Sequence, residues 1–129
     1  MRSKTILSLI CLGIATLTQT ATAGWVQTWG DEFDGNSVDR NKWNIDVNGD
    51  NPNDEKEFYT DRQENVRVAG GNLIITARRE DYGNRQFTSG KLSTFGHFTT
   101  IYGKFEMRAK LPRGQGMWPA FWMLGENIG

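Results

Sequence analysis

Apolar and polar residues alternate with a period of two along most of the chain after residue 23, which is the pattern of half-buried β-strands. No segment has a convincing 3.6-residue period. On this basis strands are predicted over 25–29, 43–47, 56–60, 66–68, 73–77, 87–94, 104–111 and 117–124. The turn residues Ala69-Gly70-Gly71-Asn72 predict a hairpin between 66–68 and 73–77. About eight short strands, separated by loops rich in Gly, Asn and Asp, favour an all-β antiparallel sandwich.

The first 23 residues have the features of a secretory signal peptide. Two basic residues precede an apolar run over 5–17, and an A-x-A pattern at 21–23 is what signal peptidase recognises. The run is too short to span a bilayer as a helix, which takes about 20 residues. A buried core helix is the alternative. We expect residues 1–23 to be removed on export, so that the mature chain starts at Gly24 and is found in the periplasm or the medium.

Charge and cysteine content narrow the class of partner. The chain has 15 basic and 15 acidic residues and no basic stripe, which argues against nucleic acid. After signal cleavage no apolar run is left to hold it in a membrane. The single cysteine, Cys11, lies in the signal segment, so the core must form without a disulfide. Five Trp, seven Phe, three Tyr and 15 Gly are typical of a secreted β-sandwich.

Two segments offer candidate chemistry. Trp118 and Trp122 share a face if 117–124 is a strand, and they either stack on sugar rings or fill the core. The loop over 48–60 is rich in Asn, Asp and Glu, which hydrogen-bond sugar hydroxyls or simply form turns. Neighbouring carboxylates such as Asp31 and Glu32 point to opposite faces of a strand, so they cannot easily flank one bond. Residue pattern alone therefore leaves an enzyme and a binding protein both open.

Several short motifs follow one another in a fixed order along the chain. They are W-G-D-E-F-D-G (29–35), W-N (43–44), N-D-E-K-E-F-Y-T (53–60), E-N-V (64–66), G-N-L-I-I (71–75), T-S-G-K (88–91), Y-G-K-F-E-M-R (102–108) and L-P-R-G to W-P-A-F-W-M-L (111–124). In this order they resemble glycoside hydrolase family 16, in particular its laminarinase-like endo-1,3-β-glucanases. The resemblance implies a β-jelly roll of the concanavalin A-like type, with a cleft along its concave sheet. Residues 24–129 would be the N-terminal portion of such a catalytic domain.

The family's catalytic strand carries the motif E-x-D-x-x-E, and this sequence contains no such motif. The resemblance implies a nucleophile and an acid/base glutamate about 5–5.5 Å apart, the separation for retention of configuration. We expect the chain to end before that strand, to hold no catalytic residue and to be inactive alone. The expected partner is a β-glucan polysaccharide, and the expected state is a monomer. A non-catalytic glucan-binding protein, or an enzyme for mixed-linkage glucan or a marine galactan, remains open.

Three substrate-binding residues are implied by the resemblance. Asn53 stands where the family places a cleft asparagine, and Trp118 stands where it places a cleft tryptophan. Lys91 takes the place of an arginine that reaches a sugar subsite. The lysine keeps the positive charge but cannot form the two parallel hydrogen bonds of a guanidinium. Trp122 is expected in the core.

The resemblance also implies a structural calcium, although no cofactor is expected for catalysis. The Glu32 carboxylate and the Gly71 carbonyl occupy the family's ligand positions. Oxygen-only calcium sites take about 6–8 ligands, so further ligands would have to come from elsewhere in the protein.

Overall fold

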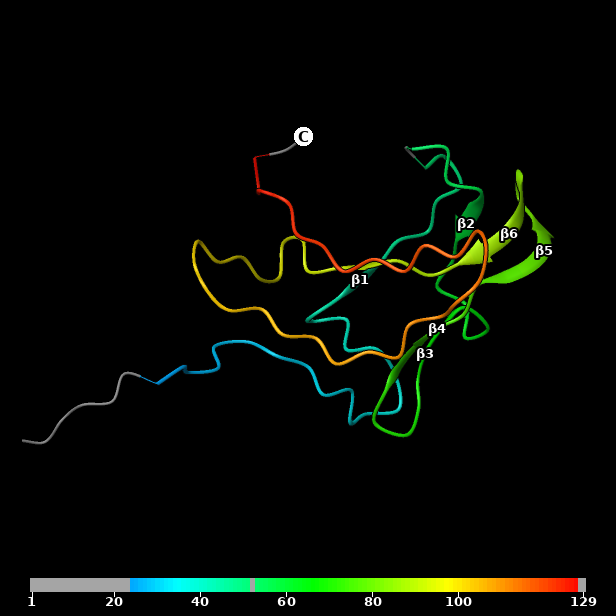
Figure 1. Ribbon diagram of the computed structural model, residues 1–129. Coiled ribbons are helices and arrows are strands. Elements are labelled where there is room, and N and C mark those ends of the chain that lie inside the picture. Colours follow the sequence, from blue (N-terminus) through cyan, green and yellow to red (C-terminus); the bar gives the residue numbers. More distant parts are fainter. Residues whose placement is uncertain (1–23, 52, 128–129) are drawn as a thin grey trace, which may run out of the picture.

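The computed structural model describes residues 24–51 and 53–127, and within that part of the chain it contains strands and no helix (Figure 1). The predicted signal peptide, residues 1–23, lies outside the described residues. No helix long and apolar enough to cross a membrane is found among the described residues. The strands are β1 (Asn44–Ile45), β2 (Glu57–Tyr59), β3 (Val66–Val68), β4 (Leu73–Ile75), β5 (Arg78–Tyr82), β6 (Arg85–Ser89) and β7 (Leu92–Ser93).

These strands form three small sheets. β1 pairs with β7 and β3 pairs with β4, both antiparallel, and the third sheet has the order β2-β6-β5. β5 and β6 are antiparallel, as expected, whereas β2 runs parallel to β6. Parallel neighbours need a long crossover connection, and the segment between β2 and β6, which contains β3, β4 and β5, is long enough to provide it.

The hairpin between β3 and β4 was predicted from its turn residues and is confirmed. Gly70 and Gly71 have φ values of +59° and +69°. Ala69 and Asn72 exchange backbone hydrogen bonds of 3.0 and 3.2 Å across them. Two central residues with positive φ make a type I′ turn, whose twist matches that of antiparallel strands, and glycine adopts this conformation without steric cost.

The apolar core lies where the hairpin meets the β1–β7 pair. Its buried members are Val38, Val66 and Val68. Partly buried side chains pack against them: Phe33, Trp43, Ile45, Leu73 and Leu92. Since these residues come from the N-terminal loop, the hairpin and both strands of the pair, one cluster holds the three segments together.

A buried polar network joins the hairpin to the β2-β6-β5 sheet. Asn65 and Thr88 are fully buried, and the Asn65 amide nitrogen donates to the Thr88 hydroxyl at 2.9 Å. Thr88 in turn donates to Glu80 at 2.5 Å, and Arg62 lies 2.5 Å from the same carboxylate. The hydrogen bond from Thr88, followed by that from Arg62, lowers the pKa of Glu80 below its ordinary value. Thr60 completes the network at the end of β2.

Three predicted strands are wrong, and one strand was missed. Residues 25–29, 104–111 and 117–124 contain no strand, because a strand needs a neighbour for its backbone groups and no described segment pairs with them. Residues 100–127, yellow to red in Figure 1, are therefore extended and exposed. Lys104 and Glu106, within this segment, form a 2.9 Å ion pair. β5 is the strand that was not predicted, because its charged sequence lacks apolar alternation.

Candidate functional site

Lys91 lies between β6 and β7 and forms an ion pair with Asp46. Its ammonium is 3.3 Å from the Asp46 carboxylate, and each side chain is about one-third exposed (32% and 34%). The pairing of Ile45 with Leu92 brings the two residues together. The Asp46 amide also donates to the Lys91 carbonyl at 2.9 Å. The ion pair is thus fixed through the backbone at the end of the β1–β7 ladder.

Two aromatic rings face the same ammonium. The Lys91 nitrogen lies 5.5 Å from the centre of the Tyr59 ring and 5.7 Å from that of the Trp122 ring. A cation within about 6 Å of an aromatic face is attracted by the ring quadrupole. We refer to Asp46, Tyr59, Lys91 and Trp122 as the Lys91 cluster. It places a charge, a carboxylate and two aromatic surfaces together at a surface open to water.

Tyr59 is held in a fixed orientation within this cluster. Its hydroxyl donates to the Glu55 carboxylate at 2.8 Å. Burial of the phenol, followed by its hydrogen bond to Glu55 and the nearby negative charge of Glu57, raises the pKa of Tyr59 well above its ordinary value. Because the hydroxyl keeps its proton, it remains a donor to Glu55, and the ring stays beside Lys91.

Asn53 lies at the tip of a loop whose base is next to the cluster. Asn48 and Tyr59 exchange backbone hydrogen bonds of 3.1 and 2.8 Å, and Asn51 donates to the Glu57 carbonyl at 2.7 Å. Asn53 is exposed and has a φ of +62°, a left-handed conformation that asparagine tolerates better than most residues. In the described part of the chain no hydrogen bond joins Asn53 to the Lys91 cluster.

Trp118 and Trp122 are both exposed to solvent, and only the exposure of Trp122 differs from what was expected. Trp118 is 77% exposed. Trp122 was expected in the core, and this is wrong: it is 55% exposed and faces Lys91. The physical reason is that the segment 117–124 is not covered by a second layer within the described residues, so neither indole can be buried there.

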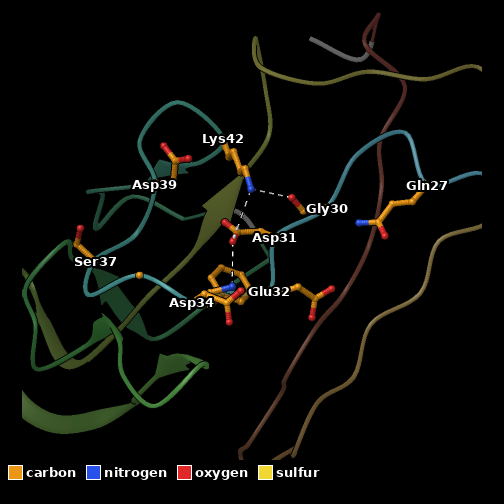
Figure 2. Close-up of a pocket in the computed structure, with 10 residues that line it drawn as sticks. Gln27, Gly30, Asp31, Glu32, Asp34, Ser37, Asp39 and Lys42 are labelled. Carbon is orange, nitrogen blue, oxygen red and sulfur yellow. Dashed lines mark hydrogen bonds and ion pairs between the residues drawn. The ribbon is translucent and has the colours of Figure 1, made fainter.

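A polar pocket of about 390 Å³ surrounds the N-terminal motif (Figure 2). Asp31 accepts hydrogen bonds from the Phe33 amide at 3.0 Å and the Trp43 indole at 2.9 Å. Lys42 donates to the Gly30 carbonyl at 2.8 Å and lies 3.8 Å from Asp31. These bonds lock the loop against Trp43, so the motif's first carboxylate has a structural role.

Comparison with known proteins identifies the family. Residues 52–128 match the sequence profile of "Glycosyl hydrolases family 16". The chain belongs to glycosyl hydrolase family 16. A "Beta-glucanase" of Rhodothermus marinus is 49% identical over 106 residues, which are 80% of this chain and 37% of that protein. A "Glucan endo-1,3-beta-glucosidase" of Cryptopygus antarcticus is 43% identical over 114 residues, covering 83% of this chain and 41% of that protein.

Solved family 16 structures confirm the jelly-roll fold. The laminarinase from Rhodothermus marinus matches with a TM-score of 0.60 and 48% identity, covering 62% of this chain and 33% of that chain. The chain therefore spans about two fifths or less of the length of these relatives. The predicted extent of the family 16 portion, residues 24–129, remains a prediction.

The residues that family 16 resemblance assigns to calcium do not form a site by themselves. Phe33, next to Glu32, and Leu73, close to Gly71, pack on the same core cluster, so their segments approach each other. However, no group of three or more His, Cys, Asp or Glu side chains is arranged to hold a metal within residues 24–51 and 53–127. Glu32 and the Gly71 carbonyl would supply two oxygens of the about 6–8 that calcium takes.

The family 16 resemblance singles out Lys91, whereas two residues beside it, Asp46 and Tyr59, were not recognised as candidates. Asp46 lies within the predicted strand 43–47 and Tyr59 within the predicted strand 56–60, so both were treated as ordinary strand residues. The available signal was the opposite charge of Asp46 and Lys91. Opposite charges indicate an ion pair only when the two residues are known to be neighbours, and that requires the pairing of β1 with β7.

Proposed function

We propose that the whole protein is a secreted endo-acting β-glucan hydrolase that cleaves 1,3-β-glucosidic bonds and retains the anomeric configuration. The observation that carries this proposal is the 49% identity, over 80% of this chain, with a family 16 protein named as a beta-glucanase. The Cryptopygus relative and the solved laminarinase support the 1,3-linkage. The Lys91 cluster is consistent with it, because sugar subsites combine aromatic faces with hydrogen-bond donors.

In this proposal the chain supplies substrate-binding residues of the cleft. The Lys91 ammonium and the Asn53 carboxamide hydrogen-bond sugar hydroxyls, and the exposed Trp118 indole stacks on the C–H face of a sugar ring. The two catalytic carboxylates belong to the E-x-D-x-x-E motif, which residues 1–129 do not contain. Hydrolysis then requires the rest of the protein, and residues 24–129 alone are inactive.

Export, calcium and oligomeric state complete the proposal. Residues 1–23 direct export to the periplasm or the medium, and the mature protein is a monomer. A structural calcium bound through Glu32 and the Gly71 carbonyl, with further oxygen ligands from the rest of the protein, would stabilise the fold without acting in catalysis. If so, a chelator lowers the melting temperature of the whole protein, whereas magnesium does not restore it.

The proposal is tested by incubating the whole protein with laminarin. Reducing ends should accumulate together with a rapid fall in chain length, since an endo-acting enzyme cuts internal bonds. Proton NMR in the first minutes should show the β-anomer as the first product, as retention requires. Laminarin binding without new reducing ends would instead support the glucan-binding alternative. Hydrolysis of agarose or carrageenan but not laminarin would show that the substrate assignment is wrong.

A further inference from the structure

The Lys91 side chain is constrained on three sides, although it sits at the surface. A carboxylate lies 3.3 Å from its nitrogen, and two aromatic rings lie 5.5 and 5.7 Å away. A surface lysine normally samples many rotamers, and its ammonium is a hydrated point charge without the preformed geometry of a guanidinium. A lysine that is to recognise one hydroxyl pattern therefore needs its neighbours to set the position of its nitrogen.

We propose that Asp46 is a positioning residue for substrate binding: it fixes the Lys91 ammonium against the Tyr59 ring so that its remaining N–H groups face a sugar. An ammonium has three N–H donors. One of them points toward the Asp46 carboxylate, which leaves two for a ligand. This inference rests on the proposed function, because it assumes that Lys91 contacts the glucan.

Asp46 is suited to this role because its own position is set by the backbone. Its amide donates to the Lys91 carbonyl at 2.9 Å, so the two residues are linked through main chain and side chain at once. Its side chain is short and has few rotamers to lose. Neighbouring β1 and β7 fix the distance between the two Cα atoms, since Ile45 pairs with Leu92.

The Tyr59 ring is equally well placed. Its hydroxyl is bonded to Glu55, and its relative exposure is only 9%. Because the ring cannot turn away, it gives the lysine stem and ammonium a fixed surface. Ordering of Lys91 thus precedes ligand binding, and less conformational entropy is lost when a sugar arrives.

The competing explanation is that the ion pair is an ordinary surface contact with no influence on substrate. Exposed ion pairs contribute little to stability. The two explanations differ in kinetics. Removing a positioning residue weakens the binding of substrate and transition state alike, which raises KM and leaves kcat nearly unchanged. Removing an ordinary surface pair changes neither.

The experiment uses the whole protein with laminarin as substrate and four variants: Asp46→Asn, Asp46→Glu, Lys91→Met and the double variant Asp46→Asn/Lys91→Met. Asp81→Asn is the matched control, because it makes the same substitution at an aspartate that is exposed on β5. Asp46→Asn keeps the side-chain shape and removes the charge. It should raise KM about 3- to 10-fold, the cost of immobilising one flexible side chain, and should change kcat less than twofold. Asp46→Glu should recover part of the loss, and Asp81→Asn should match the wild type.

The double variant decides whether Asp46 acts through Lys91. If it does, Asp46→Asn raises KM no further once Lys91 is methionine, because coupled residues are not additive. An unchanged KM for Asp46→Asn, or the same rise in KM with and without Lys91, would overturn the inference while the wild type still hydrolyses laminarin. A wild type that neither hydrolyses nor binds laminarin would instead overturn the proposed function, and this inference with it.

Discussion

Replacing Asn65 with alanine would remove four hydrogen bonds from the interior of the protein. Its carboxamide oxygen accepts from the Thr60 hydroxyl at 2.5 Å and from Arg62 at 3.0 Å. Its amide nitrogen donates to the Thr76 carbonyl at 3.0 Å and to the Thr88 hydroxyl at 2.9 Å. Asn65 has no solvent-exposed surface, and its partners Thr60 and Thr88 are also buried, so water does not replace the bonds to these two hydroxyls in the native structure.

The expected loss of stability follows from these four bonds. A hydrogen bond contributes a net 0.5–1.5 kcal/mol or so, and a buried group left without a partner costs about 1–3 kcal/mol. Four such bonds correspond to about 2–6 kcal/mol, and the removed side chain also leaves a cavity. We expect the free energy of unfolding to fall by about 3–5 kcal/mol, which is a large part of the about 5–15 kcal/mol of a typical domain.

Urea unfolding of the whole protein, followed by tryptophan fluorescence, measures this loss. With a slope of about 1–3 kcal/mol per molar urea, the midpoint should fall by about 1 M or more. Gln63→Ala is the matched control, since Gln63 is exposed in the turn just before Asn65. We expect the control to stay within about 0.5 kcal/mol of the wild type. A loss below about 1 kcal/mol for Asn65→Ala, similar to the control, would refute the reasoning.

Asn65→Asp separates hydrogen bonding from volume. The aspartate has nearly the same shape, but an oxygen would face the Thr76 carbonyl in place of the donating nitrogen. The resulting clash of acceptors should destabilise the protein even though Arg62 lies close enough to pair with the new charge. Wild-type stability for Asn65→Asp would show that the network does not need a donor at this position.

Three further predictions address pH, the hairpin and the cleft. The hydrogen bond from Thr88 lowers the pKa of Glu80, so its stabilising effect is present above the ordinary pKa of 4.5 and is lost as the pH falls through the lower folded-state value. Unfolding curves between about pH 3 and 7 should therefore show the wild type losing its advantage over Glu80→Gln at the acid end; a constant difference would contradict this. Gly71→Ala forces a φ of +69° on an alanine and should cost about 1–2 kcal/mol in thermal unfolding, whereas Gly103→Ala, with open space around it, should cost less. Trp118→Ala should weaken laminarin binding several-fold in affinity electrophoresis with unchanged stability, because stacked aromatic contacts are worth about 0.5–1.5 kcal/mol; equal affinity would exclude the indole from the cleft.

The features predicted correctly from the sequence are those that depend on nearby residues. The hairpin follows from Gly70-Gly71 between two β-branched runs, and both its strands and its turn agree with the structure. The interacting groups of this hairpin lie within a few residues of each other, so the pattern itself contains the geometry.

The pairing of distant segments was not predictable in the same way. The parallel neighbours β2 and β6 enclose three other strands in sequence, and nothing in their alternation specifies direction. The buried network likewise joins Asn65 to Thr76 and Thr88. A buried Asn or Thr has the same sequence signature as one in a loop, so only the fold reveals which of them is desolvated.

The Lys91 cluster separates what the sequence indicates about a binding residue from what only the fold shows. The resemblance to family 16 singles out Lys91 through the motif T-S-G-K, and the chemistry of an ammonium predicts a donor for hydroxyl groups. What the lysine can do depends on Asp46, Tyr59 and Trp122, which are remote from it in sequence and reach it through strand pairing and a returning segment. In the proposed function, an ammonium held by a fixed carboxylate and fixed rings distinguishes between positions of a sugar hydroxyl, whereas a mobile ammonium attracts hydroxyls without selecting among them. Selectivity at Lys91 would then depend on the β1–β7 pairing as much as on the lysine itself.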